Sequence, residues 1–365
     1  MRVVMTGGGT GGHIYPAVAI ADRIKERTLD SEILFIGTER GLEKDLVPKC
    51  GYDIRFIKVS GIDRKNPLKN IKTAKEYLEG KRMAQKIMEE FKPDVVIGTG
   101  GYVCGPVVKV ASKMGIKTYV HEQNAVPGLT NKFLEGKVDG VFLGFEEASK
   151  NFKHPEKHVV AGNPVRDGFF QADKQESREE LGIGEEFTVM SFGGSQGAGR
   201  INRAMIDVVE KYNGNPKVRV IFVTGKRFYD PVLKEFEDRK IELADNIEIK
   251  EYIYNMEKYI SAADLVISRS GALAVSEIAV CATPSILIPS PNVTGNHQYF
   301  NAKAIADKGG AVLMEEKDLT GENISKAIEK ISNDKDFMNE MSRAAKACAP
   351  VDAADIVYYH IIDEL

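Results

Sequence analysis

A histidine follows directly behind a glycine-rich turn near the start of the chain, in the stretch "VVMTGGGTGGHIYP". Glycine adopts positive φ without strain and lets the backbone approach a ligand with no Cβ in the way. Where such a turn joins a strand to a helix, free N–H groups and the helix dipole favour an anion. An imidazole titrates near neutral pH, so we expect His13 to act as a general base, or else to hydrogen-bond substrate or fix the loop.

A second glycine-rich turn, "GGSQGA", follows a later apolar run and also opens a helical pattern. Its Ser195 and Gln196 place side-chain donors beside free amides, which suits a phosphate. The simpler alternative is a tight strand-to-helix turn in which Ser195 only caps the helix. Neither turn is a P-loop, because neither has a Lys followed by Ser or Thr after its last glycine.

The first turn also fits the dinucleotide fingerprint G-x-G-x-x-G, through Gly7, Gly9 and Gly12. That pattern expects an acidic residue about 20 positions further on. Glu39 is the acidic residue available, and it comes later than that spacing. An NAD-binding enzyme is therefore a minor alternative.

A carboxylate stands in the apolar helical stretch "GALAVSEIAVCATP". Glu277 needs a partner if it is buried among Ala, Leu, Val and Ile side chains. Two adjacent hydroxyls, as on a ribose, would supply one. A salt bridge to a neighbouring Arg or Lys is the alternative.

Composition excludes several classes of protein. The 365 residues carry a net charge of -3, without the basic excess typical of nucleic-acid-binding domains. The four cysteines are far apart and predict a reducing compartment with no zinc framework. No apolar run is long enough to span a membrane, and no signal peptide precedes the first strand, so we expect a cytoplasmic protein with at most peripheral membrane contact.

Short apolar runs alternate with amphipathic stretches along the chain, a pattern typical of parallel sheets covered by helices on both faces. The pattern restarts after "HVVAGNPV", so the sequence predicts an α/β protein with two doubly wound domains, residues 1–164 and 165–350. A terminal helix over 351–365, with Asp352 as a plausible N-cap, is expected to pack back on the first domain. Both glycine turns would then lie at the carboxyl ends of strands, on a shared cleft.

The motifs "GGGTGGHIYPAVAIA", "GGYVCGPV", "HEQNAVPGLTNK", "AGNPVR", "GGSQGA", "RSGALAVSEIA" and "NHQYFNA" occur in one order over essentially the whole chain. Together they resemble the N-acetylglucosaminyltransferases of peptidoglycan synthesis. The resemblance implies a GT-B fold of two Rossmann-like domains. It also implies inverting transfer of N-acetylglucosamine from UDP-GlcNAc to the C4 hydroxyl of undecaprenyl-diphospho-muramoyl-pentapeptide (lipid I to lipid II), forming a β-1,4 linkage.

The resemblance assigns the nucleotide sugar to the C-terminal domain, and the lipid-linked acceptor and membrane to the N-terminal domain. It implies contacts of the Ile253 backbone with uracil, Arg166 with phosphate, Glu277 with ribose and Gln298 with sugar hydroxyls. The implied donor-site residues are Thr10, Gly11, Gly12, Asn124, Arg166, Ser195, Gln196, Ile253, Arg269, Ala272, Leu273, Ala274, Val275, Ser276, Glu277 and Gln298. The implied acceptor-side residues are Tyr102, His121 and Asn131. Two positions depart from some members: Ala274 replaces a hydroxyl residue, and His297 replaces the first of two consecutive glutamines.

Inverting transfer requires a base for the acceptor hydroxyl and charge stabilisation for the departing diphosphate. We expect His13 to be the base, with Glu122 and His121 of "HEQN" as rivals. The one D-x-D pair, Asp334 and Asp336, lies in a polar segment where helix capping fits better than a metal site. We therefore expect no cofactor and no tightly bound metal.

The segment 58–86 carries nine Lys and Arg residues among apolar residues at roughly helical spacing. Basic residues beside an apolar stripe attract anionic lipid, so we expect this segment to dock on the cytoplasmic face of the membrane. A solvated helix face is the alternative. Three other functions stay open: transfer to another lipid or small-molecule acceptor, UDP-GlcNAc 2-epimerisation, and non-catalytic nucleotide-sugar binding.

Overall fold

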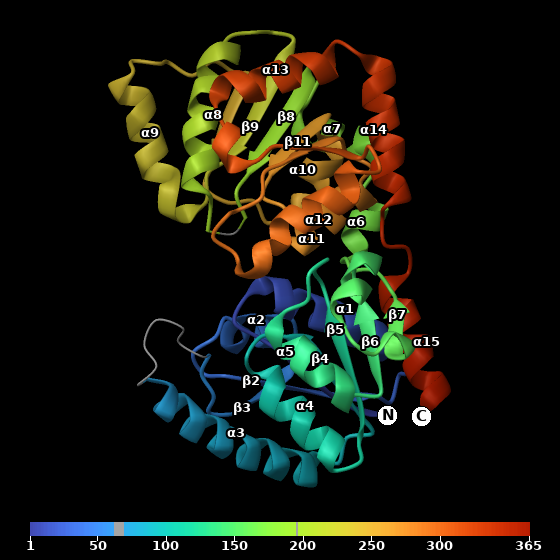
Figure 1. Ribbon diagram of the computed structural model, residues 1–365. Helices are drawn as coiled ribbons and strands as arrows, with labels where there is room; N and C mark the ends of the chain where they lie inside the picture. Colours follow the sequence, from blue (N-terminus) through green and yellow to red (C-terminus); the bar gives the residue numbers. More distant parts are fainter. Residues whose placement is uncertain (62–68, 195) are drawn as a thin grey trace. The chain divides into compact units, whose positions relative to one another are not determined.

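The computed structural model describes residues 1–61, 69–194 and 196–365. The chain forms two compact units (Figure 1). Unit 1 comprises Met1–Val165 together with Pro350–Leu365, and unit 2 comprises Arg166–Ala349. The predicted α/β class, with two doubly wound parallel sheets, is confirmed.

Unit 1 is built on a seven-stranded parallel sheet in the order β3-β2-β1-β4-β5-β6-β7. Alternate residues of one strand enter different cores, since Val3 and Met5 pack toward α1 and Val4 packs toward α3 and α4. Burial on both faces explains why these strands are apolar throughout. The strands are β1 Arg2–Gly7, β2 Glu32–Gly37, β3 Asp53–Phe56, β4 Val95–Gly100, β5 Lys117–Glu122, β6 Gly140–Leu143 and β7 His158–Val160. The helices are α1 Gly11–Arg27, α2 Glu43–Lys49, α3 Lys69–Phe91, α4 Cys104–Lys113, α5 Leu129–Leu134 and α15 Ala353–Glu364.

The C-terminal helix α15 packs on α1, which confirms the predicted return to the first unit. Asp355 pairs with Arg23 at 3.2 Å and with Arg27 at 3.1 Å. Just before this helix, Pro350 lies so close to Gly162 that a Cβ at Gly162 would stand 2.6 Å from its ring. Asp352 occupies the N-cap position as expected, but it has φ 55° and its carboxylate makes no capping hydrogen bond.

Unit 2 is built on a six-stranded parallel sheet in the order β10-β9-β8-β11-β12-β13. Its main core lies between this sheet and helices α8 and α13, with Ile201, Met205 and Ile324 fully or almost fully buried. The strands are β8 Phe187–Phe192, β9 Val218–Val223, β10 Ile247–Lys250, β11 Leu265–Ser268, β12 Ser285–Leu287 and β13 Ala311–Leu313. The helices are α6 Asp167–Gln171, α7 Lys174–Leu181, α8 Gly199–Tyr212, α9 Tyr229–Asp238, α10 Met256–Ala262, α11 Ala272–Val280, α12 His297–Ala306, α13 Gly321–Ser332 and α14 Lys335–Ala347.

Each sheet has one point where the strand order reverses, between β1 and β4 in unit 1 and between β8 and β11 in unit 2. Ligands of doubly wound sheets bind outside the carboxyl ends of the strands at such a point. Both glycine turns lie there. In unit 1 the β1–β4 pairing also slips between Thr6 and Gly7, which pair with Gly98 and Gly100.

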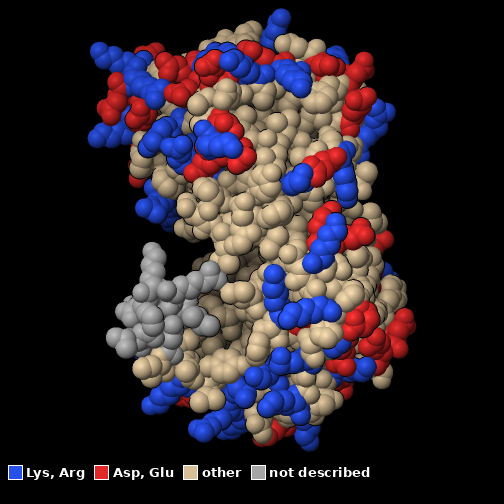
Figure 2. Space-filling view, in the orientation of Figure 1, with Lys and Arg blue, Asp and Glu red and all other residues tan. Residues whose placement is uncertain are grey.

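The surface of unit 1 that α3 and α4 form carries many Lys and Arg side chains (Figure 2). Part of the basic segment 58–86, including Arg64 and Lys65, lies outside the described residues. Among the residues described, no helix combines the length and the apolar character needed to cross a bilayer.

Candidate functional site

His13 lies in the first turn of α1, next to the turn that follows β4. The Thr99 hydroxyl donates to the His13 carbonyl at 2.7 Å and ties the two turns together. Gly100 has φ +111°, and a Cβ there would stand 2.6 Å from His13 Nδ1. The imidazole therefore occupies space that only glycine at position 100 leaves open.

A fully buried carboxylate, Glu43, lies directly beneath the first glycine turn. It accepts hydrogen bonds from Gly9 N at 2.9 Å, Thr38 N at 3.0 Å and Thr38 Oγ1 at 2.7 Å. Gly8 leaves room for it, because a Cβ at Gly8 would stand 2.7 Å from the carboxylate. The Gly9 amide, which a dinucleotide pyrophosphate would approach, is thus already taken by a carboxylate. This contact argues against the NAD alternative, and the Glu39 that it required is exposed.

The end of β5 and the loop after it bring two polar side chains, His121 and Gln123, into one hydrogen-bonded series that reaches His13. His13 Nδ1 lies 3.1 Å from Gln123 Oε1, and Gln123 Nε2 lies 3.0 Å from His121 Nδ1. His121 Nε2 in turn lies 2.9 Å from the Gly162 carbonyl oxygen. Burial lowers the pKa of His121 to about 4, so this imidazole is neutral near pH 7.

Glu122 organises the same loop. Its buried carboxylate accepts from Asn124 N at 3.0 Å, Asn124 Nδ2 at 3.1 Å, Gly128 N at 2.9 Å and Asn131 Nδ2 at 2.8 Å. Four donors occupy the acceptor sites that a base would use on a substrate. This geometry favours His13 over Glu122 as the base, and that assignment stays a prediction.

Two of the residues expected on the acceptor side lie at different depths. Tyr102 is partly exposed beside the first glycine turn, and its hydroxyl lies 3.4 Å from Thr38 Oγ1. Asn131 is 2% exposed and donates to the His121 carbonyl at 3.2 Å as well as to Glu122. Tyr102 is therefore accessible to a ligand, whereas Asn131 is buried and bonds to the loop around Glu122.

In unit 2 the second glycine turn joins β8 to α8, whose N-cap is Ala198. Ser195 lies outside the described residues, and Gln196 is exposed. Gly197 has φ +75°, and the nearest neighbours of a Cβ there would be the Thr224 carbonyl and the Phe228 ring. No carboxylate is among these nearest neighbours, in contrast with Glu43 beneath the first turn.

Helix α11 begins at the strand-order reversal of unit 2, directly after Gly271. Its first N–H groups, those of Ala272, Leu273 and Ala274, have no partner within the helix and are available to an anion. Of these residues Ala272 is buried, while Leu273 and Ala274 are partly exposed. The amides at 272–274 can thus bind a phosphate even though position 274 carries no hydroxyl.

Other predicted residues of α11 serve its packing. Val275 and Ser276 are buried, and the Ser276 hydroxyl donates to the Ala272 carbonyl at 3.0 Å. Arg269 turns away from the helix, donating to the Ile288 and Pro289 carbonyls at 3.2 and 3.1 Å and pairing with Glu316. In this structure the Arg269 guanidinium therefore bonds to protein groups at the Ile288 and Pro289 carbonyls and at Glu316.

Glu277 is partly exposed on α11, and in the described part of the chain no hydrogen bond or ion pair reaches its carboxylate. Desolvation by burial raises its pKa to about 7, against the attraction of Arg166. Hydroxyls that donate to the ionised carboxylate would offset that desolvation. The alternative salt bridge is not formed, because Arg166 instead lies 3.7 Å from Glu257.

Three further donor-site predictions fall near α11 or on loops of unit 2. Arg166 is about half exposed at the start of α6, and its guanidinium lies over the Phe169 ring. Gln298, at the start of α12, accepts from Ser290 N at 2.8 Å through its side-chain oxygen. Ile253 is 4% exposed, which fits a role through its backbone.

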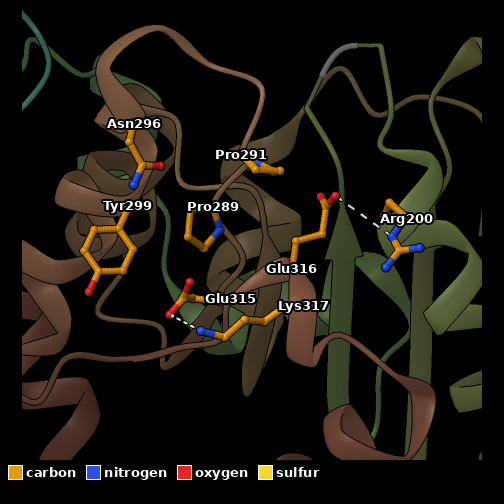
Figure 3. A pocket seen from close by; sticks show the side chains of 8 residues that line it. All are labelled: Arg200, Pro289, Pro291, Asn296, Tyr299, Glu315, Glu316 and Lys317. Atoms are coloured by element: carbon orange, nitrogen blue, oxygen red, sulfur yellow. Dashed lines mark hydrogen bonds and ion pairs between the residues drawn. The ribbon is translucent and has the colours of Figure 1, made fainter.

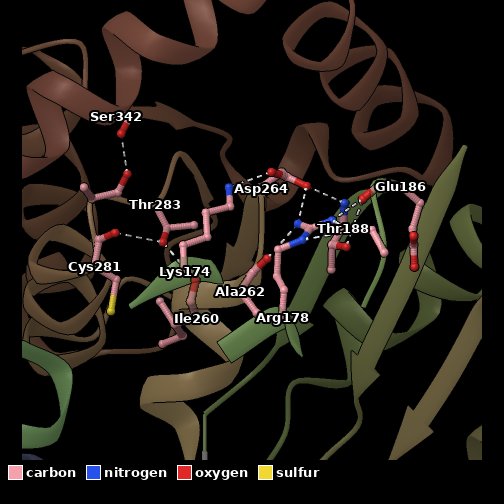
Figure 4. A network of polar contacts seen from close by, with 12 residues as sticks. Lys174, Arg178, Glu186, Thr188, Ile260, Ala262, Asp264, Cys281, Thr283 and Ser342 are labelled. Carbon is pink, nitrogen blue, oxygen red and sulfur yellow. Dashed lines mark hydrogen bonds and ion pairs between the residues drawn. The ribbon is translucent and has the colours of Figure 1, made fainter. Parts of the chain in front are cut away.

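Unit 2 also contains a pocket of about 470 Å³, lined by residues that include Arg200, Tyr299 and Glu316 (Figure 3). None of the predicted site residues lines it. A separate polar network centres on Asp264, which accepts from Lys174, Arg178 and Thr188 at 2.6 to 3.1 Å (Figure 4). This network ties α7 to the sheet and is structural.

Within residues 1–61, 69–194 and 196–365, no three His, Cys, Asp or Glu side chains gather as a metal site requires. Asp334 of the D-x-D pair caps α14 by accepting from Phe337 N at 2.9 Å, as its sequence context predicts. Sequence analysis missed Glu43, Gly100 and Gln123. Gln123 had a local signal as the unassigned member of "HEQN", and Gly100 as the first residue of "GGYVCGPV", whereas Glu43 falls in none of the quoted motifs.

Two models of one protein family match the chain. The glycosyltransferase family 28 N-terminal domain matches residues 3–143, and the C-terminal domain of that family matches residues 188–357. A protein of Alkaliphilus oremlandii named UDP-N-acetylglucosamine--N-acetylmuramyl-(pentapeptide) pyrophosphoryl-undecaprenol N-acetylglucosamine transferase is 44% identical, covering 98% of this chain and 97% of its own. A Bacillus cereus protein of the same name, numbered 1, is 44% identical over 98% of both chains.

Solved structures match over the full length. The crystal structure of Acinetobacter baumannii MurG has a TM-score of 0.78 and 26% identity, covering 99% of each chain. A UDP-GlcNAc 2-epimerase from Neisseria meningitidis, bound to UDP-GlcNAc, has a TM-score of 0.70 at 14% identity, covering 100% of both chains. The second match shows a shared fold only. The predicted GT-B fold class is confirmed.

Gly100→Ala should displace the His13 imidazole, because the new Cβ would overlap Nδ1. We expect the His13 ring resonances to shift in NMR spectra, together with a loss of about 1–2 kcal/mol of stability from positive φ. Gly115→Ala is the matched control, since Gly115 has φ +74° but nothing within 4 Å of its Cβ position. It should lose similar stability and leave the His13 resonances unchanged. Equal spectra for both variants would contradict the placement of the ring.

Proposed function

The chain belongs to the N-acetylglucosamine transferases of glycosyltransferase family 28, and we propose that its two strand-order reversals divide the reaction between donor and acceptor. The enzyme transfers N-acetylglucosamine from UDP-GlcNAc to the lipid-linked muramoyl-pentapeptide acceptor, with inversion. The proposal is that unit 2 holds the nucleotide sugar, and that unit 1 holds the acceptor and supplies the base.

The observation that carries this division is the difference in charge between the two glycine turns. Glu43 lies beneath the first turn and occupies the Gly9 amide. The nearest neighbours of Gly197 in the second turn include no carboxylate. Unit 2 also supplies the free amides at the start of α11 and the half-exposed Arg166, whose guanidinium lies 3.7 Å from Glu257. A dianionic diphosphate is favoured where positive charge and free N–H groups gather. Unit 2 is therefore the better site for UDP-GlcNAc.

In the proposed reaction, the C4 hydroxyl oxygen of the muramoyl sugar attacks the anomeric carbon from the face opposite UDP. The new O4–C1 bond forms as the bond from C1 to the diphosphate oxygen breaks, and that electron pair leaves with UDP. The hydroxyl proton passes to His13 Nε2. The α11 amides and Arg166 stabilise the charge that develops on the diphosphate.

The specific test is transfer of labelled sugar. We expect label from UDP-GlcNAc to enter a short-chain diphospho-muramoyl-pentapeptide lipid, with the same yield with and without EDTA, because protein groups stabilise the leaving diphosphate. His13→Ala should reduce kcat about 10²–10⁴-fold, the usual contribution of a general base. Conversion of UDP-GlcNAc in the absence of acceptor would instead favour epimerisation. Loss of transfer on chelation would contradict the leaving-group assignment.

Glu277 predicts a pH dependence of donor binding. Ribose hydroxyls donate to the ionised carboxylate, so binding favours the charged form and lowers its pKa from about 7. Affinity for UDP-GlcNAc should therefore fall as pH drops below 7, by up to about tenfold per pH unit, and level off above 7. Calorimetry from pH 5.5 to 8.5 measures this.

In the same titration Glu277→Gln should bind more weakly above pH 7 and lose the pH dependence. The exposed Glu322→Gln on α13 is the control and should match the parent protein. A parent profile that is flat across pH 7 would show that Glu277 does not bind the donor.

We also propose that unit 1 docks on anionic membrane through a basic–apolar patch on α3, α4, α5 and the short 3-10 helix Glu135–Lys137 that follows α5. Its members share exposure or positive charge: Ile71, Leu78, Lys81, Lys109, Leu129, Lys132, Phe133 and Lys137. Desolvation and then the charges of Lys81, Lys137 and Lys113 lower the pKa of Lys109, which places these cations close together. Lys109 and Lys137 lie 5.0 and 4.1 Å from the centre of the half-exposed Phe133 ring. This combination fits an interfacial surface at the cytoplasmic face.

Charge reversal tests the patch. Lys81→Glu with Lys132→Glu should weaken co-sedimentation with vesicles containing anionic lipid by at least about tenfold, since each basic residue contributes about 1 kcal/mol near such a surface. The control, Lys308→Glu with Lys335→Glu, changes net charge equally on exposed positions of unit 2. Equal losses for both pairs would indicate a net-charge effect and reject the patch.

A further inference from the structure

We infer that Gln123 is a positioning residue that fixes the tautomer of His13, so that Nδ1 carries the ring proton and Nε2 presents the lone pair. The inference rests on the proposed function, in which His13 is the base. It follows from three consecutive hydrogen bonds that connect Gly162, His121, Gln123 and His13.

The first link fixes His121. A carbonyl oxygen can only accept, so the 2.9 Å contact with Gly162 O requires a proton on His121 Nε2. His121 is 0% exposed and neutral near pH 7. A neutral imidazole carries one ring proton, and His121 Nδ1 is therefore a lone pair.

The second link fixes the amide of Gln123. Gln123 Nε2 faces two acceptors, His121 Nδ1 at 3.0 Å and the His121 carbonyl at 3.1 Å. A flipped amide would point its oxygen at both of them. Gln123 is 2% exposed, so water could not compensate for that repulsion. The NH₂ group therefore faces His121, and Oε1 faces His13.

The third link fixes His13. Gln123 Oε1 can only accept, so the 3.1 Å contact requires a proton on His13 Nδ1. Neutral His13 then has its lone pair on Nε2, the atom that takes the acceptor proton in the proposed reaction. The His13 Nδ1–H group still donates to Gln123 Oε1 after Nε2 is protonated, so this hydrogen bond persists before and after proton transfer.

Gln123→Met removes the amide hydrogen bonds that link His13 to His121, while keeping a side chain of similar length. We expect kcat to fall about 10–100-fold, less than the 10²–10⁴-fold contribution of a general base, because His13 itself is retained, and we expect the donor KM to stay unchanged. Gln175→Met, on the exposed face of α7, is the matched control and should behave as the parent protein.

The decisive readout is independent of turnover. Ring ¹⁵N shifts of labelled protein distinguish a protonated Nδ1 from a protonated Nε2. The parent protein should show His13 with Nδ1–H and His121 with Nε2–H at pH 8, and Gln123→Met should populate Nε2–H at His13. His13 with Nε2–H in the parent protein overturns the inference, even if His13→Ala shows that this residue is the base. If the tautomers are as stated but His13→Ala keeps its kcat, the proposed function fails instead.

Gln123→Glu gives a second test if the methionine variant folds poorly. A carboxylate beside His13 stabilises the imidazolium and should raise the pKa of the ascending limb of kcat by about 1–3 units. The carboxylate would also favour protonation of His121 at Nδ1. An unchanged pH profile in a folded Gln123→Glu protein would show that residue 123 does not act on His13.

Discussion

The reversal of strand order between β1 and β4 is the constraint on which the rest of unit 1 depends. At that point the turns after the two strands separate. The His13 ring from one turn and the glycine backbone at Gly100 from the other fill the space between them. His13 enters beside Gly100, and the Thr99 hydroxyl holds the two turns together. The loop after β5, the next strand in the sheet, then reaches the same ring through Gln123. A parallel sheet thus brings residues from three separate turns to one imidazole.

Buried carboxylates hold these turns in place. Glu43 gathers N–H and O–H donors under the first turn, and Glu122 does so within the loop after β5. Each offsets the cost of its burial by accepting several hydrogen bonds, and each leaves the nearby ligand-facing groups fixed. The sequence motif alone makes the two glycine turns look alike. The buried charge beneath one of them makes them different anion sites.

Much of the fold could be predicted from sequence because strands buried on both faces are continuously apolar and because glycine turns mark where strands become helices. Strands of three residues, such as β7 and β13, are too short to show a periodicity from which their bounds could be predicted. Residues such as His13 and Glu277 stood out because their chemistry conflicts with their surroundings. Glu43 and Gln123 did not, because the contacts that link them to the first glycine turn and to His13 span 34 and 110 residues. Arg269 shows the opposite problem. Its place in a motif predicts a contact with the donor, but in the structure its guanidinium bonds to the carbonyls after β12.

Pro350, near the carboxyl terminus, packs closely against Gly162, and the hydrogen bonds that start at Gly162 lead to His13 near the amino terminus. The Gly162 carbonyl ends the series of hydrogen bonds that begins at His13, and the chain passes over Gly162 at Pro350 before entering α15. The residues from Pro350 onward thus pack against the segment at one end of this series, and α15 packs on α1, which carries His13 at the other end. Loss of the carboxyl-terminal residues would therefore disturb His13 by two routes, through the segment at Gly162 and through the packing of α1.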